Sequence, residues 1–554
     1  MPGDETGLSP LQTNGRGLKN SVLRISSVVA IGGVILAIII DGLTSTQRTI
    51  PPANPDDPVR LPSGVTRRVL VAGAGLAGLS AALELAERGY EVTIRESSDV
   101  VGGRLFAKPV VRLNRTFPVE HGFHAWFHNY HTFKDIRRRL DIDDNFKTWE
   151  AVDYVFKKYK PESIYSQGPY PLNLFGIVLR SPNFKFLDIL IPGNILALPD
   201  MIWFNHDTVY EQYDNMTFVE WAKESRIDPK FFDILLKPAL SVSLNEQQTM
   251  SAAEMLMYIQ MYFLSDAKAD SREVTTKNYH TAVLEPWLKK LASYGTKIET
   301  KTPIRSLVFN ATNGHVIGED GHPEEHFDHV VLATDLEGVQ SIMGSTLTKY
   351  KSGDSIHNSL SKFVEKTSRL SIAPPYKVLR VWFDKQLKNA PSILETPEFF
   401  PINLIVQYHM LEEEFAEWAN ETGGSVLEFH LYTWEYGQVS DEEVWDIISP
   451  TVKVIYPEIF DRQFKTLAYH VHSFQNFPSF QAGLHIHRPK STFAAECGIE
   501  NLALAGDWLH TDYPSALMER AVSTGREAAN QILLLDHIRQ VPLTVTSSYG
   551  PGLL

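Results

Sequence analysis

The sequence predicts an α/β protein whose central unit is a Rossmann-type dinucleotide-binding domain. Residues 69–72 form a short, entirely apolar run, as expected for a buried parallel strand. A glycine motif, an Ala- and Leu-rich helix over 79–86 and a second strand over 90–94 follow in order. A glycine motif alone is weak evidence, but this strand–helix–strand context makes the prediction specific. The motif residues and the acidic residue ending the second strand are Gly73, Gly75, Gly78 and Glu96.

Each of these residues has a physical role in holding a dinucleotide. Gly73 allows the tight turn, Gly75 lets a pyrophosphate approach the backbone, and Gly78 lets the helix pack against the strand. The N-terminus of that helix favours an anion because its free N–H groups carry partial positive charge. Glu96 is placed to accept hydrogen bonds from a ribose 2′-hydroxyl, and its charge disfavours a 2′-phosphate.

The segment 100–105, Val-Val-Gly-Gly-Arg-Leu, indicates which dinucleotide is bound. It resembles the second glycine pair of the large flavoprotein family that contains amine oxidases and carotenoid desaturases. In that family the segment runs beside the FAD phosphates and the flavin. The resemblance therefore implies that FAD is the cofactor and that Gly102, Gly103 and Arg104 bind it.

The composition narrows the class of protein further. The chain has 554 residues, 43% of them hydrophobic, which is enough for more than one domain and a sizeable core. A net charge of −14 argues against nucleic acid as a partner. Cys497 is the single cysteine, so an internal disulfide and a thiolate metal cluster are both excluded.

The first 66 residues are expected to lie outside the catalytic fold. Basic residues precede an uncharged apolar run, Ile25–Ile40, which is slightly short for a bilayer core of about 30 Å. Signal anchor, cleaved signal peptide and buried helix are the alternatives, and we favour an uncleaved N-terminal hydrophobic helix that anchors the protein in a membrane. The sequence does not decide on which side of the membrane the enzyme lies. The Pro-rich stretch 44–64 is expected to be an extended linker.

A segment rich in histidine and aromatic residues, 119–133, follows the first nucleotide-binding unit. Three interpretations compete for it. A metal site ranks last, because no carboxylate or second histidine cluster is spaced to complete one. A packed aromatic segment ranks second. The favoured interpretation rests on resemblance, since Glu-His-Gly-Phe-His is similar to the desaturase segment that passes near the flavin, which makes His121 and His124 candidate catalytic residues.

Two apolar stretches suggest how a substrate domain is built. Residues 184–204 are strongly apolar but broken by Pro192, Gly193 and Pro199, so they form either core or a lipid entry port at a membrane interface. Residues 250–264 are apolar nearly all round at helical spacing, which predicts a buried Met-rich helix. Both lie in a mostly helical insertion that we expect to cover the cofactor domain.

The remaining cofactor signals come from later segments and rest on resemblance to the same family. Residues 297–309 are expected to form paired strands; in the matching family segment the residue at Ile304 lies against adenine. Residues 501–529 resemble the segment that closes the FAD site, with Gly506 and Asp507 near the ribityl chain or pyrophosphate and Met518 opening the last helix. The expected organisation is an N-terminal segment 1–66, a discontinuous FAD-binding domain 67–150, 280–345 and 496–536, a mixed α+β substrate domain 151–279 and 346–495, and a C-terminal tail 537–554.

Three short motifs narrow the resemblance to the carotenoid ring desaturases, namely Glu-His-Gly-Phe-His near 121, Met-Ser-Ala-Ala-Glu near 252 and Ala-Leu-Met-Glu-Arg-Ala near 518. This branch implies an apolar isoprenoid substrate that gives a hydride to FAD, with quinone or oxygen as electron acceptor. His121 or His124 then accepts the proton or orients the substrate. The alternatives are a flavin amine oxidase and a non-redox FAD protein, either an isomerase or a subunit of a membrane complex.

Overall fold

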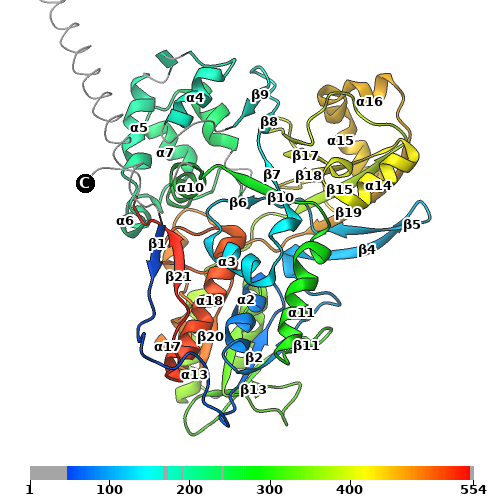
Figure 1. Cartoon of the computed structure of the whole chain (residues 1–554). Helices are drawn as coiled ribbons and strands as arrows, with labels where there is room; N and C mark the ends of the chain where they lie inside the picture. The colour runs from blue at the N-terminus through cyan, green and yellow to red at the C-terminus, as the bar shows by residue number, and fades with distance from the viewer. Residues whose placement is uncertain are drawn as a thin grey trace, which may run out of the picture.

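The computed structural model describes residues 47–165, 172–185, 187–188, 191–238, 243–246, 248–265 and 268–549. The nucleotide-binding domain forms the lower part of the molecule in Figure 1. Two units lie above it, a helical cap and a sheet covered by helices. The expected apolar run Ile25–Ile40 lies outside the described residues.

The nucleotide-binding domain is built on a five-stranded parallel sheet of order β11-β3-β2-β14-β20. Its strands come from three separate parts of the chain, as the sequence predicted for a discontinuous domain. One detail differs, because Lys297–Glu299 pairs with β3 in this sheet and not with the strand that follows it. The strands are β2 (Arg68–Ala72), β3 (Glu91–Arg95), β11 (Lys297–Glu299), β14 (His329–Leu332) and β20 (Leu502–Leu504).

Helices α2 (Leu76–Ala86) and α18 (Leu517–Leu535) pack closely against each other on this sheet. Gly525 permits the approach, because a Cβ built there would lie 2.3 Å from the carbonyl oxygen of Ala77. The Ser80 hydroxyl donates to the Val522 carbonyl across the same contact, at 2.7 Å. The last helix of the chain is thereby fixed beside the first nucleotide-binding helix.

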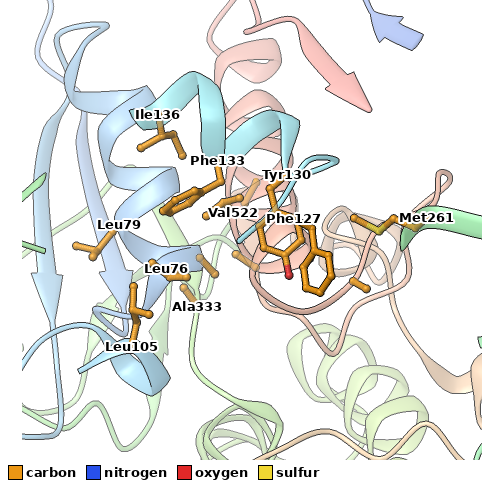
Figure 2. Packing of buried hydrophobic residues seen from close by; sticks show 14 of the residues in the cluster. Leu76, Leu79, Leu105, Phe127, Tyr130, Phe133, Ile136, Met261, Ala333 and Val522 are labelled. Atoms are coloured by element: carbon orange, nitrogen blue, oxygen red, sulfur yellow. The ribbon is translucent and has the colours of Figure 1, made fainter. Parts of the chain in front are cut away.

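The main core lies between these helices and α3 (His131–Leu140), as Figure 2 shows. Tyr130 and Phe133, at the start of α3, face side chains of α2 and α18 in that view. The same cluster continues to Met261, which directly follows helix α10 (Ala252–Ile259) of the cap. One apolar core therefore joins the cofactor domain to the cap. Other elements of the lower part are α11 (Glu285–Ser293), β12 (Leu307–Phe309), β13 (Val316–Glu319), α12 (Leu336–Leu347), α13 (Ser355–Thr367) and α17 (Phe493–Glu496).

The second sheet has seven strands in the order β19-β15-β18-β17-β16-β8-β9 and is antiparallel except where β16 meets β8. The long strand β15 (Tyr376–Phe383) is completely buried, because its two faces pack on different cores. The other strands are β8 (Val152–Tyr154), β9 (Glu162–Ile164), β16 (Ile393–Glu395), β17 (Leu404–Gln407), β18 (Ser425–Leu431) and β19 (Thr466–Phe474), and the covering helices are α14 (Glu413–Thr422), α15 (Asp441–Ile455) and α16 (Pro457–Asp461).

Two smaller β structures connect these units. The hairpin β4–β5 extends from the nucleotide-binding domain, and the three-stranded sheet β6-β10-β7 lies between the domain and the cap. Their bounds are β4 (Ala107–Arg112), β5 (Arg115–Glu120), β6 (Trp126–Phe127), β7 (Phe146–Trp149) and β10 (Arg272–Thr275).

The cap is mostly helical, as expected. Helix α10 (Ala252–Ile259) is buried along its whole length, which confirms the expectation for the Met-rich segment. The apolar run 184–204 is only partly buried. Ala197 and Met201 of α5 (Pro192–Ile202) are buried, whereas Leu196 is exposed. Among the described residues no helix combines the length and the apolar character needed to cross a membrane. The other cap helices are α4 (Leu172–Arg180), α6 (His206–Tyr213), α7 (Phe218–Glu224) and α8 (Pro229–Phe231).

The stretch expected to be an independent linker is instead part of the fold. Residues 47–50 form β1 (Gln47–Ile50), which pairs antiparallel with β21 (Leu543–Thr546) in the expected C-terminal tail. The two strands lie side by side in Figure 1. The backbone of Ala53 also donates to Gln540, and Leu61 N–H donates to the Arg88 carbonyl. The boundary at residue 66 is therefore wrong, because backbone pairing to distant residues is not visible in local composition.

A chain that begins at Thr66 is expected to unfold about 1–3 kcal/mol more easily than one that begins at Gln47. It loses the cross-strand pairs of β1, and it uncovers the buried side chains of Leu543 and Val545. Both chains are expected to bind FAD, because the glycine motif begins only at Gly73. Thermal unfolding and flavin absorbance check this, and equal stability of the two chains would contradict it.

Candidate functional site

The predicted glycine loop adopts the conformation that a dinucleotide site requires. Gly73 has φ of +104°, and a Cβ there would lie 2.7 Å from the Ala333 carbonyl oxygen. A Cβ on Gly78 would lie 2.0 Å from the Gly73 carbonyl oxygen, so helix and strand meet as predicted. Gly75 differs, because a Cβ there would meet only the Cα of Gly103, at 3.8 Å, among the described residues. The face above Gly75 is therefore open.

The second glycine pair lies directly beside the first loop. Gly75 and Gly102 form an isolated parallel bridge, and Gly102 N–H donates to the Ala74 carbonyl at 2.8 Å. Gly102 and Gly103 have φ of +110° and +55°, in the left-handed region that favours glycine. The structure thus brings together two glycine segments that the sequence identified separately.

Glu96 connects the end of β3 to this loop. One carboxylate oxygen accepts from Ala74 N–H at 2.9 Å, and the other accepts from Ser98 N–H at 2.8 Å. A carboxylate has about four acceptor positions, so capacity for a ribose hydroxyl remains. The predicted ribose-binding residue is held at the glycine loop.

Arg104 and Asp507 form an ion pair of 2.5 Å between the first and last cofactor segments. Burial lowers the pKa of Arg104, but Asp507 outweighs this and the net shift of that pKa is upward, so the guanidinium stays charged. Its Nη1 is buried and has no partner among the described residues. A buried, unused guanidinium donor beside a glycine loop fits a bound pyrophosphate. Gly506 makes the turn before Asp507, with φ of +151°.

Two other predicted cofactor residues lie at the margins of this loop system. Ile304 is half-buried against the core cluster that contains Leu332 and Leu504. Met518 lies in the first turn of α18 and is half-buried against the main core. Their predicted places at the cofactor stay predictions.

His121 is buried in an aromatic cluster. Its Nε2 lies 2.8 Å from the Tyr376 hydroxyl, and its ring centroid lies 3.9 Å from that of Phe474. Burial, with His124 and Arg104 nearby, lowers the pKa of His121 well below its usual value. The ring is therefore neutral at physiological pH.

His124 has a defined tautomer. Its Nδ1 lies 2.7 Å from the Gly122 carbonyl oxygen, which can only accept, so Nδ1 carries the proton. In the neutral ring Nε2 then holds a lone pair. Burial lowers the pKa of His124 to about 4, so this neutral form prevails above pH 5. Nε2 of His121 is engaged with the Tyr376 hydroxyl, whereas His124 makes its ring hydrogen bond through Nδ1. The catalytic roles of both histidines stay predictions.

Buried charged residues of β5 and of the second sheet lie next to these histidines. Arg380 forms ion pairs with Glu428 at 2.5 Å and with Glu120 at 3.0 Å. Glu428 also lies 2.8 Å from Nε2 of His430, and it accepts from Phe123 N–H at 3.0 Å. The network fixes the backbone between the two histidines. The sequence did not identify it, because its members come from three distant segments.

A second buried network joins the cap to the cofactor domain. Glu254 of α10 accepts from Arg520 at 2.6 Å and from Arg488 at 3.0 Å, and the Tyr210 hydroxyl donates to it at 2.7 Å. Arg488 also donates to the carbonyls of Trp508 and Leu509 beside Asp507. Glu254 and Arg520 stand in two of the motifs quoted from the sequence, but no role was predicted for either.

Comparison with known proteins identifies the family. Residues 76–533 match the family described as flavin containing amine oxidoreductase. The chain belongs to this family, and the glycine loop, Glu96 and the Arg104–Asp507 pair fit its cofactor. The protein is an FAD-dependent oxidoreductase.

Among its curated relatives are two carotenoid phi-ring synthases. The protein from Chlorobaculum tepidum is 25% identical, with 87% of this chain and 91% of that protein covered. The protein from Streptomyces griseus is 28% identical, with 85% and 88% covered. A 15-cis-phytoene desaturase from Synechococcus elongatus is 21% identical, with 84% and 96% covered. The expected resemblance to the carotenoid desaturase branch is confirmed.

Solved structures share the fold at low sequence identity. Putrescine oxidase bound to putrescine has a TM-score of 0.57 at 13% identity, with 85% of this chain and 99% of that chain covered. Reduced UDP-galactopyranose mutase has a TM-score of 0.58 at 14% identity, with 85% and 96% covered. Because these proteins differ in chemistry, the likeness shows the fold and not the substrate.

Proposed function

We propose that this protein is a carotenoid-modifying oxidoreductase that takes a hydride from an allylic position of an apolar isoprenoid. The observation that carries the proposal is its similarity to two carotenoid phi-ring synthases over 85% or more of the chain. The aromatic surroundings of His121, formed by Phe106, Tyr376 and Phe474, support an apolar substrate. Burial of apolar area contributes about 25 cal/mol per Å², which favours a long polyene over a small amine.

The chemistry that FAD supplies when bound is acceptance of a hydride. The residues of the chain hold the substrate carbon in place, exclude water and accept the proton that leaves beside the new double bond. His124 is proposed as this acceptor, through the lone pair on Nε2. His121, held by Tyr376, orients the substrate from the same loop. Quinone or oxygen is proposed as the final electron acceptor.

A comparison of substrates tests the proposal. Oxidised, FAD-loaded protein is mixed without oxygen with monocyclic and bicyclic carotenoids, with phytoene, and with a panel of primary and secondary amines. Loss of flavin absorbance with a carotenoid is expected. Bleaching by an amine and by no isoprenoid would identify an amine oxidase instead. If product forms and the absorbance never changes, the protein is a non-redox isomerase.

Replacement of His124 by Ala is expected to slow flavin reduction by the substrate about 100-fold or more, because a positioned proton acceptor is lost. FAD content is expected to stay unchanged, since no predicted cofactor residue is altered. His128→Ala is the matched control, as this histidine belongs to the same segment and its Nδ1 lies 3.0 Å from Lys134 Nζ. If His124→Ala and the wild type reduce flavin at equal rates in a single turnover, His124 has only a packing role.

Membrane association is a further part of the proposal. The uncharged run Ile25–Ile40 supports an N-terminal anchor, and carotenoids partition into bilayers because they are apolar. Fractionation of cells that express the whole chain is expected to place it with the membranes. Recovery of the intact chain in the soluble fraction would refute the anchor.

A further inference from the structure

The outer face of the cap helix α5 is unusual because it exposes large apolar side chains. Leu196 on the helix and Trp203 at its C-cap are 65% and 52% exposed. On the opposite face Ala197 and Met201 are buried in the main core. Helix α5 thus has buried apolar side chains on its inner side and exposed apolar side chains on its outer side, which no other described residue covers.

Two more exposed apolar side chains lie next to the ends of this helix. At its start, the side-chain amide of Asn194 donates to the Asp188 carbonyl, which places α5 beside Leu187, a residue 71% exposed. At its end, Asn205 forms a β-bridge with Tyr549, which is 57% exposed. We refer to Leu187, Leu196, Trp203 and Tyr549 as the cap face. Tryptophan and tyrosine are the residues typical of the membrane–water interface.

The N-terminus of the described chain is also at the cap face. Gln47 of β1 pairs with Thr546, and three residues later Tyr549 pairs with Asn205, the N-cap of α6, in the turn that follows α5. The His206 N–H donates to the Ser548 carbonyl at the same point, at 2.8 Å. β1 and β21 run up to α6 (His206–Tyr213) in Figure 1. Gln47, the first described residue, therefore lies near the exposed side chains, and the run Ile25–Ile40 precedes it in the sequence.

We propose that the cap face lies on the surface of a lipid bilayer, with Leu187, Leu196 and Trp203 inserted among the headgroups and upper acyl chains. Two observations favour a bilayer over a second copy of this chain. The apolar run of the same chain precedes Gln47, which lies near this face, and the exposed aromatic residues have the amphipathic character of interfacial anchors. The proposal rests on the proposed isoprenoid substrate, because a cap held against the bilayer brings the substrate domain to the phase that dissolves an isoprenoid.

Depth-dependent quenching tests the cap face on the whole chain. Leu196→Cys, in a Cys497→Ala background, is labelled with an environment-sensitive fluorophore and reconstituted into phosphatidylcholine–phosphatidylglycerol vesicles. Lipids brominated on the upper acyl chain are expected to remove about half or more of the fluorescence, since interfacial side chains reach about 5–10 Å into the bilayer. Val454→Cys is the control, because Val454 is 68% exposed but lies on α15 over the second sheet.

The outcomes separate this proposal from its alternatives. Quenching at 196 and not at 454 supports the cap face, while equal quenching at both positions or at neither would overturn it. Shielding of the label at 196 that grows with protein concentration in lipid-free detergent would assign the face to contacts between copies. Flavin reduction by carotenoids dissolved in detergent tests the proposed function separately, because it does not require the bilayer.

A double variant adds a functional measurement. Leu196→Asp with Trp203→Asp is expected to lower turnover of vesicle-embedded carotenoid about tenfold and to leave turnover in detergent unchanged, because charged side chains resist insertion. Equal turnover from vesicles and from detergent would count against the cap face even where the protein is membrane-bound through its N-terminus.

Discussion

A Gly75→Val variant is expected to fold as the wild-type chain does and to bind FAD at least about 100-fold more weakly, a loss of about 2.7 kcal/mol. Gly75 is extended, with φ of −76° and ψ of 178°, a conformation that valine adopts readily. A Cβ there meets only Gly103 among the described residues, at 3.8 Å, so the protein itself has room for it. The added methyl groups then occupy the face over which the pyrophosphate passes.

Flavin absorbance per polypeptide and the thermal unfolding of the apoprotein measure the two effects separately. Gly344→Val on α12 is the control, because a Cβ at that position has no neighbour within 4 Å. Gly78→Val is expected to give the opposite pattern and damage folding itself, since its Cβ would lie 2.0 Å from a backbone oxygen. Full FAD occupancy in Gly75→Val would disprove the assignment of the phosphate loop.

The contrast between these glycines shows what local sequence predicts well. The strand, turn and helix around Gly73 follow from hydrophobic pattern and glycine spacing within a few residues, whereas Gly506 was identified through resemblance to the family. The buried α10 was predictable for the same reason, since apolar residues all round a helix leave it no solvent-facing side.

Contacts between distant segments were not predictable in this way. Arg104 and Asp507 were each identified from the sequence. Their ion pair forms only because the fold brings the second glycine segment next to the residues that follow β20. The hydrogen bond between Tyr376 and His121 requires the second sheet to pack on the nucleotide-binding domain. β1 went unpredicted because its partner lies at the opposite end of the sequence and its own residues are mostly polar. A single sequence carries no signal for such pairs.

The Glu254 network is the most consequential contact of this kind, and Glu254→Gln is expected to destabilise the protein by about 3–5 kcal/mol. The carboxylate is shared by two guanidiniums, and Glu254, Arg488 and Arg520 are all buried. Glutamine keeps the shape but leaves two buried positive charges without a counter-charge. The expected result is a Tm lower by about 5 °C or more, with FAD more easily lost because Arg488 holds the carbonyls of Trp508 and Leu509.

Two comparisons decide whether charge is the cause. Glu458→Gln removes a partly exposed ion pair with Arg462, and such pairs contribute about 0–1 kcal/mol, so its Tm should barely change. The second comparison is pH. Burial opposes ionisation of Glu254, but Arg520 and Arg488 outweigh it and lower its pKa to about 2. A lowered pKa stabilises the fold above the unfolded value of about 4.3, and this contribution is lost as pH falls toward 2. The gap in Tm between wild type and Glu254→Gln should thus be constant from pH 5 to 8 and narrow below pH 4; a gap that does not change with pH would mean that lost packing, not lost charge, destabilises the variant.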